Sequence, residues 1–133
     1  MTFAARAFTP ATGVAFTSDV EAVDYRDGTL VVLVACSLGE GGTVYGLRVT
    51  FAQPGGFRLL DELDLQRYWT AGDRPRGSHV LEVTAGGWGA EEGTLQGFDT
   101  ACREWLIVTG NACVSVFCAD EPAVAETEWR FAG

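Results

Sequence analysis

The sequence predicts a mainly β fold, a bent antiparallel sheet packed as a sandwich or an incomplete barrel with one or two short helices. Val, Thr, Phe, Tyr and Trp recur in short runs between glycines, a composition typical of strands. Two turn dipeptides, Asp27-Gly28 and Gly110-Asn111, each lie between β-rich runs. Residues 43–51 and 126–131 alternate between apolar and polar side chains, which is the period of a half-buried strand.

The first half of the chain is expected to form a three-stranded meander over residues 20–26, 29–37 and 43–51. The first two strands flank Asp27-Gly28, where both turn residues must accept a positive φ. Residues 29–37 are apolar on both faces, which is typical of a central strand covered on each side. In the third strand, four side chains are expected to share one face: Tyr45, Leu47, Val49 and Phe51.

The second half is expected to begin with a short strand over residues 57–60 and a helix over Asp61–Trp69. Asp61 can cap this helix, acids fill its first turn, and Arg67 lies in its last turn. A loop then leads to a strand over residues 78–84.

The remaining elements follow from glycines and alternation. Four glycines around Trp88 predict an irregular loop over Ala85–Gly93. Residues 104–109 and 112–118 are expected to pair as a hairpin, with Gly110-Asn111 as a type II′ turn because glycine comes first. A closing strand follows at residues 126–131.

Length and charge limit the classes of function. A chain of 133 residues is expected to form one domain. The net charge is −9, and the segment from Glu82 to Glu128 contains nine acidic residues and a single basic one, Arg103. Such a surface repels phosphate backbones and anionic membranes, so neither nucleic acid nor membrane is an expected partner, whereas a basic protein is. Arg6 and Pro10 interrupt any signal-peptide core, and no apolar stretch reaches transmembrane length, so a cytoplasmic location is expected.

Signatures of catalysis and of cofactor binding are weak. The single histidine, His79, has no GxSxG motif near it, and no phosphate-binding glycine loop is present. The cysteines form no CxxC pair and are expected to be buried thiols: Cys36, Cys102, Cys113 and Cys118. The sequence therefore predicts no metal, no cofactor and no catalytic residue.

Two stretches couple aromatic rings to carboxylates, Phe57–Trp69 and Ser78–Gly93. A tryptophan beside glycines can present its ring to a ligand or a partner. The candidate binding residues in these stretches are Trp69, His79, Trp88, Glu91 and Glu92. The alternative is structural: both tryptophans are core rings, the glycines allow close backbone approach, and the histidine is exposed or hydrogen-bonded at a strand edge.

Three segments resemble a group of uncharacterised bacterial proteins. Residues Phe57–Trp69 fit an FRxLDExDLxxYW pattern, Gly86–Glu92 fit GGWxxEE, and Glu104–Phe117 resemble the closing hairpin of that group. The resemblance covers the C-terminal two-thirds of the chain. It implies a self-contained bacterial domain and brings no assigned activity.

Composition and motifs together predict a non-enzymatic acidic interaction protein that binds a basic protein partner, as the immunity proteins of toxin systems do. The alternative is a small-molecule-binding domain or enzyme with a pocket near the five candidate residues. A third hypothesis is a homodimer paired through a strand edge.

Overall fold

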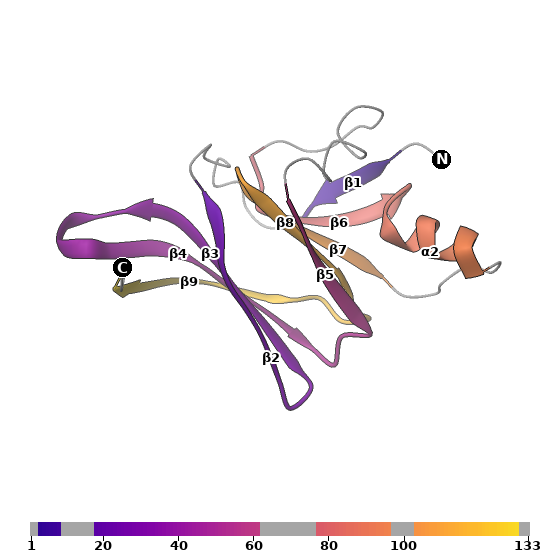
Figure 1. The fold of residues 1–133 in the computed structure, drawn as a ribbon, viewed down its shortest axis with the longest axis horizontal. Helices are drawn as coiled ribbons and strands as arrows, with labels where there is room; N and C mark the ends of the chain where they lie inside the picture. The colour runs from indigo at the N-terminus through magenta and orange to yellow at the C-terminus, as the bar shows by residue number, and fades with distance from the viewer. Residues whose placement is uncertain (1–2, 9–17, 62–76, 97–102, 131–133) are drawn as a thin grey trace.

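The computed structural model describes residues 3–8, 18–61, 77–96 and 103–130. Over these residues the chain forms two antiparallel sheets (Figure 1). Sheet A contains, in spatial order, β1 (Ala4–Ala7), β6 (Val80–Ala85), β7 (Glu104–Val108), β8 (Ala112–Phe117) and β5 (Gly56–Asp61). Sheet B contains β2 (Asp19–Arg26), β3 (Thr29–Leu38), β4 (Thr43–Ala52) and β9 (Ala123–Arg130). The helical elements within the described residues are the 3-10 turn η1 (Glu40–Gly42) and the helix α2 (Trp88–Gln96). The mainly β prediction is confirmed, in its sandwich form.

The predicted meander is confirmed as β2, β3 and β4. Asp27 and Gly28 both have positive φ, 50° and 76°, as a hairpin turn of the right twist requires. In β3 and β4 the buried side chains lie directly opposite one another, as Leu30 does to Phe51 and Val32 to Val49. These cross-strand pairs form the half of the core that sheet B contributes.

The expectation that the strand at residues 29–37 is covered on both faces is wrong. β3 is central within sheet B, but Val31, Leu33 and Ala35 on its second face remain partly exposed. The reason is that sheet A packs against one face of sheet B only. An apolar run on both faces can therefore occur in a strand that is buried on one side.

The main core lies between the two sheets. It is formed by Leu30, Val32, Val34, Leu47, Val49, Phe51, Val80, Trp105, Ile107, Val114, Val116 and Cys118. A second apolar cluster lies on the outer face of sheet A and contains Phe3, Leu60, Leu81, Leu106, Val108 and Cys113. Sheet A is thus buried on both faces, and all five residues of β7 are buried.

One helical prediction lies outside the described residues and another needs correction. Asp61 is the last residue of β5, and the rest of the predicted helix, residues 62–69, is not among the residues that the structure describes. The predicted loop over Ala85–Gly93 instead contains most of α2. The physical reason is a carboxylate from β7 that caps this helix, described below.

The second hairpin is confirmed as β7 and β8, but its turn is not of type II′. Gly110 has no positive φ, which that type requires at its first position. Instead, the hydroxyl of Thr109 accepts hydrogen bonds from the backbone N–H groups of Asn111 and Ala112, at 3.3 and 3.0 Å. The side chain of Ser18 holds the turn from outside, because its Oγ accepts from the Gly110 N–H at 2.9 Å.

One strand is longer than predicted, and one strand was not predicted at all. β9 begins at Ala123, before the alternating residues that predicted it, and β1 had no sequence signal. Within the described residues no helix is long and apolar enough to cross a membrane.

Candidate functional site

Three candidate residues, Trp88, Glu91 and Glu92, lie together on α2, where Trp88 and Glu91 contact side chains of β5 and β8. The indole of Trp88 stacks on Phe117 of β8 with ring centroids 4.2 Å apart. The guanidinium carbon of Arg58 on β5 lies 4.7 Å from the centroid of the same indole. Trp88 Nε1 donates to Glu92 at 3.0 Å, and Arg58 Nη1 lies 3.6 Å from the Glu91 carboxylate. The residues of this cluster therefore contact one another.

Glu104, at the start of β7, holds the N-terminus of α2. Its two carboxylate oxygens accept hydrogen bonds from the backbone N–H groups of Trp88 and Gly89, at 2.8 and 2.6 Å. The first N–H groups of a helix have no partner within it, so this carboxylate caps α2 from another strand. Burial raises the pKa of Glu104, and the two N–H donors partly oppose that shift.

Gly87 makes this cap possible. A Cβ at Gly87 would lie 2.7 Å from Cγ1 of Val83 and would also collide with the Glu104 carboxylate. Sequence reasoning did not select Glu104. The available signal was an acid that directly begins an apolar strand, where a charged side chain needs a partner inside the protein.

His79 lies apart from this cluster, between the sheets. Its side chain is buried, and Nδ1 lies 2.8 Å from the backbone carbonyl of Val108. A carbonyl only accepts, so Nδ1 donates this hydrogen bond. Nε2 lies 3.6 Å from the thiol of Cys36 on β3, and burial raises the pKa of that thiol. His79 and Cys36 thus form a polar contact between the sheets, away from Trp88. Trp69 lies outside the described residues.

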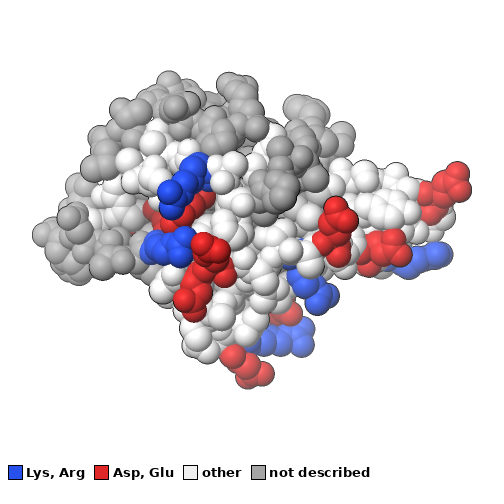
Figure 2. Space-filling model, turned by 180° about the vertical axis from the view of Figure 1, so that it is seen from behind, with Lys and Arg blue, Asp and Glu red and all other residues white. Residues whose placement is uncertain are grey.

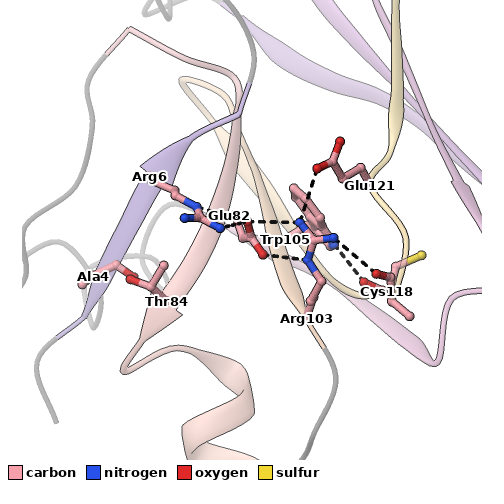
Figure 3. Close-up of polar contacts among 9 residues, drawn as sticks. Ala4, Arg6, Glu82, Thr84, Arg103, Trp105, Cys118 and Glu121 are labelled. Carbon is pink, nitrogen blue, oxygen red and sulfur yellow. Dashed lines mark hydrogen bonds and ion pairs between the residues drawn. The ribbon is translucent and has the colours of Figure 1, made fainter.

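A second buried carboxylate, Glu82 on β6, lies between two arginines (Figure 3). Arg6 on β1 donates to Glu82 through Nη2 at 2.7 Å. Arg103, the residue before β7, donates to it through Nε at 2.8 Å. These donors lower the pKa of Glu82, and Arg103 contributes most. Arg103 also lies 3.7 Å from Glu121, and its guanidinium carbon is 4.7 Å from the ring centroid of the core residue Trp105.

The other described C-terminal acids lie on β9 of sheet B or in the segment just before it. They are Asp120, Glu121, Glu126 and Glu128, and all four are exposed. Figure 1 shows the β3–β4 hairpin and the end of β9 extending beyond the strands of sheet A. Figure 2 shows acidic side chains spaced along this extension, with arginines beside them. In the described part of the chain, no three His, Cys, Asp or Glu side chains are grouped so as to hold a metal ion.

Comparisons with known proteins add no relative. The chain matches no protein-family model, no curated protein and no solved structure. The resemblance to bacterial proteins therefore stays a prediction.

Proposed function

We propose that this protein is a non-enzymatic acidic interaction protein that binds a basic protein partner through β9 and the turn before it, in the manner of an immunity protein. One observation carries the proposal. The C-terminal acids that the structure describes divide into two groups. One group has partners inside the chain: Glu82, Glu91, Glu92 and Glu104. The other group is exposed on or next to β9: Asp120, Glu126 and Glu128, together with Glu121, which is exposed but lies 3.7 Å from Arg103.

The charge of the exposed group favours a basic partner. From Asp120 to Arg130 the chain carries four acids and a single base, Arg130. Complementary charge accelerates association and excludes partners of like charge. Phosphate backbones and anionic membranes are repelled by the same surface. Two of the described cysteines, Cys36 and Cys118, are free thiols, which suits a reducing compartment such as the cytoplasm.

The test is affinity capture from lysate with matched variants. Glu126→Gln with Glu128→Gln removes two charges from β9, and Glu21→Gln with Glu40→Gln removes the same number from exposed sites elsewhere. We expect wild type and the control pair to capture basic proteins that elute as salt rises from about 50 to about 500 mM, and the β9 pair to lose them. Capture that is equal for both pairs, or that ignores salt, would contradict the proposal.

A small-molecule site at α2 is the second candidate, because one observation favours it. The hydroxyl of Ser115, opposite Arg58 in the register of β8 and β5, is buried without a hydrogen-bond partner. An unpaired buried hydroxyl costs about 1 to 3 kcal/mol, and a small polar ligand or a water could supply the missing bond. Against a larger ligand, the Trp88 ring and the carboxylates there already engage one another.

A thermal-shift screen of small polar metabolites tests this second candidate. A compound that stabilises wild type but not Ser115→Ala would support a ligand at α2. If Ser115→Ala raises the melting temperature and no compound acts on wild type, Ser115 is only an unsatisfied hydroxyl.

A further inference from the structure

β9 is an edge strand with an open side. Among the described strands it pairs with β4 alone, so the backbone groups on its other edge have no strand beside them. The indole of Trp129 does not cover that edge, because it leans toward β4. A Cβ atom built on Gly46 of β4 would lie 2.9 Å from Cη2 of this indole. An unpaired edge of eight residues is a template for an added strand.

The two faces of β9 differ in chemistry. Glu126 and Glu128 share one face with Leu47 and Tyr45, their partners on β4. Tyr45 is 46% exposed because sheet B extends past sheet A here. The opposite face of β9 carries small and apolar side chains: Ala125, Thr127 and Trp129.

We infer that the basic partner contributes an extended segment, which joins sheet B as a fifth strand beside β9 and carries basic side chains at alternate positions. The inference rests on the proposed function and specifies its chemistry. Side chains of a strand alternate between faces, so every second residue of the segment would lie beside Glu126 and Glu128. The residues between them would lie beside Ala125 and Thr127, where small or apolar side chains fit. Each cross-strand pair of opposite charge stabilises the added strand, and the backbone hydrogen bonds provide the rest of the affinity.

A second copy of the chain fits this edge less well. In an antiparallel pair related by a twofold axis, side chains on the same face lie opposite one another. In the two registers that overlap β9 with its copy most fully, Glu126 lies opposite either Glu126 or Glu128 of the copy. Like charges in directly opposite positions destabilise a pair of strands. The exposed acids therefore disfavour self-pairing while they favour a basic segment.

The test uses octapeptides of alternating Arg and Val, as long as β9, with binding measured by fluorescence anisotropy. A peptide of the same composition with its arginines consecutive controls for charge. Two further peptides are N-methylated, one on the Val amides and one on the Arg amides. In an added strand only alternate amides face β9, so we expect one methylated peptide to lose at least about tenfold in affinity and the other to change little. We expect the peptide with consecutive arginines to bind several-fold more weakly than the alternating one.

The outcomes separate this inference from the proposed function. If both methylated peptides bind like the parent but Glu126→Gln with Glu128→Gln weakens them all, strand addition is wrong and the basic partner stands. If that double variant and the control pair bind every peptide as wild type does, the proposed surface itself is wrong. Absence of binding by every peptide at about 1 mM would also overturn the inference. So would light scattering that shows a dimer of the protein alone, if that dimer dissociates when the edge of β9 is blocked.

Discussion

Sheets A and B use their acidic residues in opposite ways. In sheet A, Glu82 and Glu104 are buried and accept hydrogen bonds from arginines or from a helix terminus. In sheet B, Glu126 and Glu128 are exposed on a strand with no fully buried residue. Within the described residues sheet A is covered on both faces, whereas sheet B has one open face, and its edge strands β2 and β9 each pair with a single strand. The comparison teaches that the place of an acid in the fold, and not its residue type, decides whether it has a partner inside the chain or remains exposed.

The largest effect is expected from Glu104→Ala, which removes the cap of α2. Two partly buried N–H groups lose their acceptor, so the free energy of unfolding should fall by about 2 kcal/mol. Chemical denaturation measures this loss, and circular dichroism should show reduced helix signal. A loss below about 0.5 kcal/mol would mean that Glu104 behaves like a surface acid and would remove the contrast between the sheets.

The pH dependence of Glu104→Gln sharpens the same point. The pKa of Glu104 is raised above its usual value of about 4.5, so on raising the pH the unfolded chain releases this proton before the folded chain does. Its ionisation therefore lowers the free energy of unfolding as pH rises from about 4.5 toward neutral. Glu104→Gln abolishes that decline. Its deficit relative to wild type should shrink over this range, and a deficit that grows would contradict the assignment.

Trp88→Ala tests the docking of α2 by aromatic contact. The substitution removes the stack on Phe117 and the contact with Arg58, and for a half-buried ring we expect a loss of about 2 kcal/mol. Trp88→Phe keeps a ring but loses the hydrogen bond to Glu92, so its loss should be about half as large. Binding of the alternating Arg–Val octapeptide should be unchanged in both variants. Weaker peptide binding would place the recognition surface at α2 instead of β9.

Glu82→Gln should cost less, about 1 kcal/mol, because both arginine partners reach solvent. The pKa of Glu82 is lowered, so its contribution is complete above the usual glutamate value and is lost as pH falls through the lower folded value. The free energies of unfolding of wild type and variant, measured by denaturation from about pH 5 down to about pH 3, should therefore converge. Curves that diverge on acidification would show that the ion pairs do not stabilise the fold.

The smallest effect on stability is expected from Glu126→Gln with Glu128→Gln. Both side chains are exposed, so the free energy of unfolding should change by no more than about 0.5 kcal/mol. The same variant should nevertheless lose the salt-dependent partner. A large loss of stability would mean that these acids, like those of sheet A, serve the fold.

Local signals in the sequence predicted the elements that depend on local chemistry. Asp27-Gly28 fixed the first hairpin because both residues accept the backbone that the turn needs. α2 escaped prediction because its local sequence is rich in glycine and its cap comes from Glu104, in a strand that follows later. The second turn was predicted in place but not in type, because Thr109 and Ser18 side chains hold it.

The same distinction applies to the candidate site. Trp88, Glu91 and Glu92 could be grouped from the sequence because they are close along the chain. Their partners Arg58 and Phe117 reach the cluster from other strands through sheet A pairing, which no local pattern specifies. His79 was selected for its chemistry, but the fold buries it between the sheets. Which acids remain exposed was equally hidden, since that depends on where each strand lies.

The most direct measurement is amide mapping by NMR, with ¹⁵N-labelled protein titrated with the alternating Arg–Val octapeptide. The central claim predicts that the largest shift changes lie at Ala123–Arg130 of β9, with smaller ones on β4, and that amides at the open edge of β9 exchange more slowly with solvent once the peptide is bound. Changes centred on α2 and Arg58, or on the opposite edge strand β2, would contradict it.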